Sequence, residues 1–86
     1  MRYTLNVARK AKKYLLSLTD KNLKARLEEA INGLASNPRP PECLKMQGGD
    51  GLYRVRVGDC RIIYEIQDAV LVVLVVQIGN RREIYR

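Results

Sequence analysis

Histidine is absent from this 86-residue sequence, which removes the side chain that most often moves protons near neutral pH. Its absence excludes acid–base catalysis by histidine, metal sites with histidine ligands, and Ser–His or Cys–His nucleophile pairs. Tryptophan and phenylalanine are also absent, which leaves five tyrosines as the aromatic side chains available for stacking. Catalysis by this chain would therefore depend on arginine, lysine, tyrosine, aspartate or glutamate.

Cysteines and long apolar runs are scarce as well. Cys43 and Cys60 form neither a disulfide framework nor the spacing of a zinc site, so we expect no metal, no cofactor and a reducing, cytoplasmic location. The longest apolar run, residues 69–76, suits one buried strand and falls short of the ~18–20 residues of a membrane span. The residues after Met1 lack the apolar region of a signal peptide.

Positive charge is in excess. Sixteen lysines and arginines against nine acidic residues give a net charge of +7 and a pI near 9.8. Such a chain attracts polyanions such as RNA. Its length predicts a single small domain, residues 1–86, with so small a core that a partner chain can matter for stability.

Apolar spacing in the first half predicts a strand and then two helices. Residues 2–7 form the expected strand, and Asp20 is expected to cap the second helix. The proline-rich segment 37–41 ends that helix, since proline cannot continue it. Two apolar stripes recur at helical spacing: Val7, Ala11, Tyr14, Leu15 and Leu18, then Leu23, Leu27, Ala30, Ile31 and Leu34.

The second half changes to the alternation of strands. Residues 53–57 and 60–66 flank Gly58-Asp59, which predicts a hairpin with a type II′ turn. A weaker turn at 68–69 leads to residues 70–78, whose continuous apolar run predicts a central strand covered on both faces. Together the elements predict an α+β fold: an N-terminal strand, a two-helix hairpin and then an antiparallel meander, with the helices packed on one face of a four- to five-stranded sheet.

The hairpin fixes which side chains share a face. With Gly58-Asp59 as the turn, Arg56 lies opposite Arg61. The face expected to meet the helices carries Tyr53, Val55, Val57, Cys60, Ile62 and Tyr64. The other face carries Arg54, Arg56 and Arg61, with Glu65 diagonal to Arg54.

A like-charge pair directly across two strands destabilises a sheet, so the Arg56–Arg61 pair suggests a bound polyanion. An ordinary solvated sheet face is the competing interpretation, and it suits any one arginine taken alone. The cluster of three arginines, with Arg81 and Arg82 further along the chain, favours anion binding. Arginine suits phosphate because its planar guanidinium donates hydrogen bonds in pairs.

The segment Tyr53–Ile66, followed by Val75–Tyr85, resembles the RelE/ParE toxin superfamily on its RelE side. The two helices and the proline-containing loop fit this family too, so the resemblance covers essentially the whole chain and implies the RelE-like microbial RNase fold. It also implies a toxin of a type II toxin–antitoxin system. An acidic antitoxin would wrap and neutralise such a toxin in a hetero-oligomer.

Toxins of the RelE branch cut mRNA in the ribosomal A site without a metal, by attack of the 2′-hydroxyl on its adjacent phosphate. The family's basic strand positions fall on Arg54 and Arg56, its later arginines on Arg61 and Arg81, and its C-terminal tyrosine on Tyr85. The resemblance therefore implies catalytic roles for Arg61, Arg81 and Tyr85. It implies RNA or phosphate binding by Arg54 and Arg56, to which we add Arg82.

Some family members carry lysines at the positions of Arg54 and Arg56. Arginine stays protonated and cannot serve as a general base. We predict that Glu65 balances Arg54 rather than accepting the proton, which leaves solvent or the ribosome as the acceptor. Two other functions stay open: a ParE-like inhibitor of DNA gyrase, and a non-catalytic RNA- or ribosome-binding module derived from a toxin.

Overall fold

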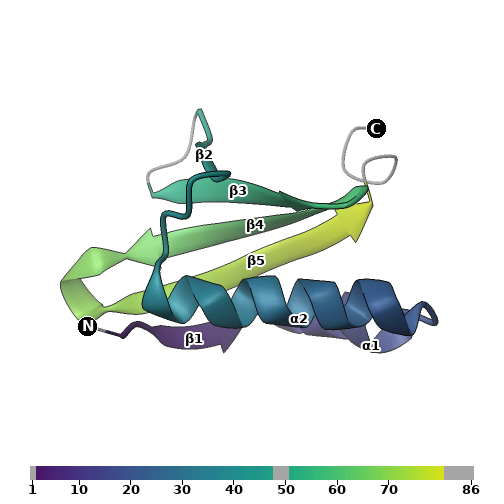
Figure 1. Ribbon diagram of the computed structural model, residues 1–86. Coiled ribbons are helices and arrows are strands. Elements are labelled where there is room, and N and C mark those ends of the chain that lie inside the picture. The colour runs from purple at the N-terminus through teal and green to yellow at the C-terminus, as the bar shows by residue number, and fades with distance from the viewer. Residues whose placement is uncertain (1, 48–50, 81–86) are drawn as a thin grey trace.

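The computed structural model describes residues 2–47 and 51–80. The chain runs through β1 (Thr4–Val7), α1 (Arg9–Ser17), α2 (Lys21–Ser36), β2 (Leu44–Lys45), β3 (Leu52–Val57), β4 (Cys60–Gln67) and β5 (Val72–Asn80). A short 3₁₀ helix, Asp68–Val70, joins β4 to β5. Both helices lie on one face of a five-stranded sheet (Figure 1), so the predicted α+β fold is confirmed.

The strands follow the order β1-β5-β4-β3-β2 across the sheet. The predicted antiparallel meander is found in β3, β4 and β5, and β2, which was not predicted, pairs antiparallel with β3. The first strand lies outside the meander, and β1 pairs in parallel with β5. A parallel neighbour requires a long crossover, and the helices and the meander together supply it. The sheet is therefore mixed, with β1 and β2 at its two edges.

The two helices begin and end where their sequences direct them. Asp20 caps α2, since its side-chain oxygen accepts a hydrogen bond from the backbone N–H of Leu23 at 3.1 Å. The helix ends at Ser36, directly before Asn37-Pro38. The helix residues that join the core on the sheet are Ala11, Leu15, Leu27, Ile31 and Leu34.

The β3–β4 hairpin has the predicted register in every pair. Gly58 adopts a φ of 60°, as the first position of a type II′ turn requires, and the pairing runs from Val57–Cys60 to Tyr53–Tyr64. The inward side chains Val55, Val57, Cys60, Ile62 and Tyr64 are all buried. The arginines between them consequently point to the face that carries no helix.

The prediction for β5 was only half right. The strand is central, between β1 and β4, but the helices cover one of its faces. Val73, Val75 and Ile78 are buried on that face, whereas Val72 and Leu74 are half-buried. A register shift opposite Ile63 and Tyr64 keeps Val75 and Ile78 both buried despite their odd spacing. An apolar run thus does not require a second covering layer.

No helix among the described residues is long and apolar enough to cross a membrane.

Gly33 lies inside α2 where nothing in the packing requires a glycine. An added Cβ atom would meet no heavy atom within 4 Å. Because glycine costs a helix interior about 0.5–1 kcal/mol relative to alanine, we expect Gly33→Ala to raise the free energy of unfolding by about that amount. Urea denaturation monitored by circular dichroism measures the change.

Gly58→Ala is the matched control for this prediction. The φ of 60° at Gly58 is strained for any residue with a Cβ atom, so this variant should lose about 1 kcal/mol or more. Equal effects of the two alanines would contradict the assignment of Gly33 as an unconstrained helix position.

Candidate functional site

Three arginines form a cluster on the sheet face that carries no helix. Arg54 and Arg56 lie on β3, and Arg61 lies on β4 directly opposite Arg56. Residues two apart on a strand share a face and lie about 7 Å apart, while neighbouring strands lie about 5 Å apart. The structure therefore brings together these three predicted site residues within one small area.

The cluster lines a hollow of about 350 Å³, which we call the arginine hollow. The residues that line it are Glu42, Leu44, Arg54, Arg56 and Arg61. Sequence reasoning missed Glu42 and Leu44. Leu44 reaches the hollow because it lies on β2 and pairs with Arg54, which places Leu44 and Arg54 on the same face of the sheet. A strand of two residues carries too short an alternation to be recognised in a sequence.

The three arginines differ in exposure. Arg56 is exposed and Arg54 half-buried, but Arg61 has only 7% of its surface exposed. Arginine stays protonated even at this degree of burial. The hollow thus holds a cation on a side chain fixed by packing, beside two more accessible cations, and this arrangement suits a ligand with several negatively charged oxygens.

Glu65 lies on the same face as the arginines but does not line the hollow. Its Oε1 atom accepts a hydrogen bond of 2.6 Å from the side-chain amide of Gln67. The balancing contact with Arg54 stays a prediction. Among the residues that the structure describes, no group of three or more acidic, cysteine or histidine side chains could hold a metal ion.

Arg81, Arg82 and Tyr85 lie outside the described residues, so their positions stay predictions. The strand that precedes them ends close to the hollow. On β5, Gly79 pairs with Arg61, and Asn80 pairs with Cys60.

A second polar cluster, which the sequence did not reveal, ties distant segments together. Asp68 accepts a hydrogen bond from the Tyr3 hydroxyl at 2.6 Å and forms an ion pair of 2.8 Å with Arg39. The Arg39 guanidinium also donates to the Tyr53 hydroxyl at 3.2 Å and lies 5.3 Å from the centre of its ring. The cluster fastens the proline loop to β3 and to the β4–β5 connection.

Titration follows from these contacts. The hydrogen bond from Arg39, and to a smaller extent the one from Tyr3, lowers the pKa of Asp68 below its ordinary value. The hydrogen bond to Asp68 raises the pKa of Tyr3. Burial raises the pKa of Tyr64, whose hydroxyl donates to the carbonyl oxygen of Pro38 at 2.8 Å. These groups keep one charge state near neutral pH, and the cluster holds the structure together rather than moving protons.

Stability should depend on pH through Asp68. Because the folded-state pKa is depressed, the ionised carboxylate stabilises the fold above the unfolded pKa of about 3.9. This contribution disappears as the pH falls through the lower folded-state pKa. We expect Asp68→Asn to be less stable than wild type at pH 7, with the difference shrinking below about pH 4. Urea denaturation between pH 2.5 and 7 measures both curves, and a constant difference would contradict the assignment.

Asp59→Asn is the control for that experiment. Asp59 is an exposed residue of the β3–β4 turn, where asparagine fits equally well. Its substitution should leave the pH dependence of wild type nearly unchanged.

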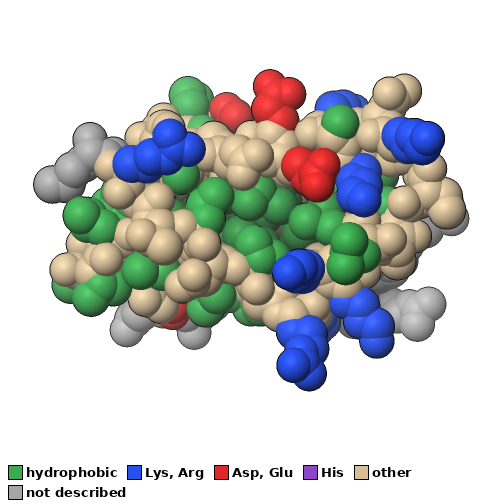
Figure 2. All heavy atoms as spheres, turned by 90° about the horizontal axis from the view of Figure 1, so that it is seen from below, with side chains coloured by type: hydrophobic (Ala, Val, Ile, Leu, Met, Phe, Trp, Pro, Cys, Tyr) green, Lys and Arg blue, Asp and Glu red, His purple; other side chains and the backbone are tan. Residues whose placement is uncertain are grey.

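A larger groove lies at the opposite edge of the sheet, between β1 and the two helices. Its volume is about 640 Å³. We call it the helix groove; it is lined by Leu5, Asn6, Val7, Lys12, Leu15, Leu16, Lys24, Glu28, Ile31 and Asn32. Figure 2 shows this side of the molecule, with hydrophobic side chains in the middle and both basic and acidic side chains around them. Leu16 is 67% exposed.

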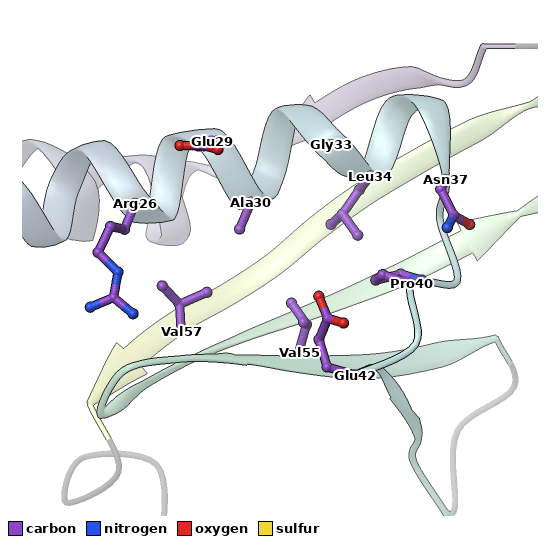
Figure 3. A pocket seen from close by; sticks show the side chains of 10 residues that line it. All are labelled: Arg26, Glu29, Ala30, Gly33, Leu34, Asn37, Pro40, Glu42, Val55 and Val57. Carbon is purple, nitrogen blue, oxygen red and sulfur yellow. The ribbon is translucent and has the colours of Figure 1, made fainter.

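A third hollow separates α2 from β3. Figure 3 shows its apolar floor, to which Val55 and Val57 contribute, with Arg26 and Glu29 on the helix side. Glu42 lines this cleft as well as the arginine hollow, and in Figure 3 its carboxylate points into the cleft, beside Pro40. Glu42 therefore lies between the two hollows.

The chain is similar to known toxins over nearly its whole length. Residues 5–85 match the family model of the ParE toxin of the type II toxin–antitoxin system parDE. A curated protein of Methanocaldococcus jannaschii that carries the toxin name RelE1 is 29% identical over 89 residues, which span 100% of this chain and 98% of that protein.

Solved structures show the same fold. The RelE–RelB complex of Pyrococcus horikoshii contains a chain that is 30% identical, with a TM-score of 0.82 over 94% of this chain and 97% of the other. The intact RelBE toxin–antitoxin complex of E. coli contains a chain that is 22% identical, with a TM-score of 0.78. That likeness covers 91% of this chain and 95% of the other.

Proposed function

The chain belongs to the RelE/ParE superfamily of type II toxins, and we propose that it is a ribosome-dependent endoribonuclease that cleaves mRNA in the A site and thereby inhibits translation. The observation that carries this proposal is the arginine hollow. Three arginines line one hollow there on a sheet face free of helices, in a chain of net charge +7. Phosphate is the ligand that such a set of paired donors suits best.

The proposed reaction is a transesterification within the RNA. The 2′-hydroxyl loses its proton, and its oxygen forms a bond to the adjacent phosphorus. The bond from phosphorus to the 5′-oxygen breaks, and that oxygen leaves with a proton. The products are a 2′,3′-cyclic phosphate and a 5′-hydroxyl, and the reaction consumes neither water nor a metal ion.

In this reaction Arg61 and Arg81 clamp the scissile phosphate and stabilise the charge that grows on its oxygens. Burial of Arg61 supports this role, because a fixed donor needs no reorganisation as the charge develops. Arg54 and Arg56 hold the flanking phosphate and favour the ionised form of the attacking 2′-hydroxyl.

Arg82 adds to the binding of the RNA backbone, and Tyr85 stacks on a base or passes a proton to the 5′-oxygen. The proton of the 2′-hydroxyl passes to solvent or to the ribosome. Glu42 is the one carboxylate that lines the hollow within the described residues, and its side chain turns into the neighbouring cleft.

Substitutions in the hollow test the proposal. We expect Arg61→Lys, which keeps the charge but loses the paired donors, to slow single-turnover cleavage on mRNA-programmed ribosomes by about 10²–10³. Arg56→Ala should weaken cleavage less, and Arg81→Ala should abolish toxicity on expression. Lys10→Ala, which removes an exposed cation of α1, is the matched control and should cleave nearly as wild type.

Thermal unfolding of each variant is measured to check that its fold is intact. In-frame mRNA cuts after induction, lost in Arg61→Lys and Arg81→Ala, would support both the activity and the site. Unchanged cleavage in both variants would refute the site assignment.

The match to the ParE family model favours one second candidate, an inhibitor of DNA gyrase. Growth arrest with intact mRNA and gyrase-dependent DNA breaks would identify that activity. The absence of both growth arrest and cleavage would instead favour a non-catalytic RNA- or ribosome-binding module.

We further propose that an acidic antitoxin neutralises this toxin in the cytoplasm, in a hetero-oligomer, and that one of its apolar segments occupies the helix groove. Leu5, Leu15 and Leu16 offer the groove's apolar surface. Lys12 and Lys24 offer positive charge against the single acidic lining residue, Glu28, so the groove complements an acidic amphipathic segment.

Leu16→Glu tests this surface. Leu16 is 67% exposed, so the change should leave the fold and the toxicity intact. A new negative charge in an apolar groove should weaken antitoxin binding about tenfold or more, measured by calorimetry and by rescue of growth on co-expression. Val70→Glu, at a second exposed apolar residue outside the groove, is the control. Equal rescue of Leu16→Glu and wild type would exclude the groove as the docking surface.

A further inference from the structure

Three large apolar side chains are markedly exposed among the described residues: Leu16, Leu44 and Val70. Leu44 differs from the other two in its surroundings, because it lines the arginine hollow. It is 56% exposed, although it lies in a paired strand. Among the described residues that line the hollow, Leu44 is the one apolar side chain, so no apolar neighbour in that lining covers it.

The sheet register places Leu44 level with the cationic cluster. It pairs with Arg54 on β3, and Arg54 pairs in turn with Ile63 on β4. The next pair on the same face of the sheet is Arg56 and Arg61. An apolar side chain therefore lies about 5 Å, one strand spacing, from the cationic column of β3, on the same face.

The backbone around Leu44 is well held. A turn just before β2 is closed by a hydrogen bond of 3.0 Å from the N–H of Cys43 to the carbonyl oxygen of Pro40. Beyond the strand, the N–H of Met46 donates to the carbonyl oxygen of Leu52 at 2.9 Å. The backbone position of Leu44 is thus set by the turn before it and by its pairing with β3, and its side chain lies on the wall of the hollow.

RNA presents charges and apolar surfaces in alternation. Each anionic phosphate adjoins a ribose and a base whose ring faces are poorly hydrated, and a site for RNA uses both. A wall that combines guanidinium donors with an aliphatic side chain offers the same alternation. A simple anion such as a free phosphate would use the arginines and leave Leu44 in water.

We infer that Leu44 is a nucleoside-contacting residue: the base or ribose next to the phosphate held by the arginine hollow packs against its side chain. The inference rests on the proposed RNase function and adds a contact that positions the substrate. Leu44 takes no part in bond making. Its loss should raise KM and leave kcat nearly unchanged. The effect on KM should be seen with every RNA sequence that places a nucleoside against Leu44.

Methyl NMR tests the contact directly. A hexanucleotide with 2′-O-methyl riboses cannot be cleaved, because its nucleophile is blocked, and it can be added to the ¹³C-methyl-labelled full-length chain. We expect shifts and intermolecular NOEs at the Leu44 methyls, with Leu16 and Val70 as unmoved references in the same spectrum. Inorganic phosphate at the same concentration of negative charge should change the chemical shifts of the Leu44 methyl groups far less.

Cleavage kinetics on programmed ribosomes supply the functional test. We expect Leu44→Ala to raise KM about 3–10-fold, as loss of part of a buried aliphatic contact predicts, and Leu44→Tyr to restore or lower it by stacking. Val70→Ala removes a similarly exposed apolar group outside the hollow and should match wild type.

The outcomes separate this inference from the proposed function. Normal wild-type cleavage with the same KM for wild type, Leu44→Ala and Val70→Ala would overturn the Leu44 contact and leave the RNase proposal standing. Impaired antitoxin rescue with unchanged KM in Leu44→Ala would make Leu44 a protein contact and would also overturn it. Wild-type protein that neither cleaves mRNA nor binds the oligonucleotide would overturn both proposals.

Discussion

The register of the β3–β4 hairpin is the constraint on which the rest of this structure depends. Side chains alternate along a strand, so a slip of one residue would turn every inward group outward. The turn at Gly58 and Asp59 excludes that slip, because Gly58 holds the φ of 60° that the tight turn requires. One short turn therefore sends Val55 and Ile62 into the core and the arginines to the opposite face.

The helices and the arginines depend on this sorting in different ways. The inner face gains stability from burial beneath α1 and α2, and this burial gives the sheet a rigid backbone. The outer face contributes less, since the Arg56–Arg61 pair opposes like charges at a cost of about 0.2–1 kcal/mol. A rigid core thus holds in place a cationic surface that would not assemble by itself. Charges fixed in this way need little rearrangement to receive an anion.

The sequence was informative where the signal is local. The cap at Asp20, the stop at Pro38 and the hairpin at Gly58 each act within a few residues, and all three are found in the structure. The missed features depend on distant partners. Tyr3 meets Asp68 across 65 positions, and no periodicity announces such a contact.

The same limit explains the incomplete site. Arg54, Arg56 and Arg61 could be placed together from the hairpin alone, because two adjacent strands carry them. Leu44 enters through a third strand of two residues, whose pairing depends on the proline loop before it. The parallel pairing of β1 and the half-buried face of β5 likewise follow from how the elements assemble.

The absence of histidine also bears on how such a toxin is controlled. Arginine keeps its charge across the physiological pH range, so protonation cannot switch off the attraction of the hollow for phosphate. Neutralisation of the proposed activity would then have to come from another molecule. The helix groove and the arginine hollow lie at opposite edges of the sheet, beside β1 and β2 respectively. A partner anchored in the groove would leave the hollow open unless another of its segments crossed the molecule. The wrapping, acidic antitoxin proposed above would satisfy both requirements, with apolar residues in the groove and carboxylates at the arginines.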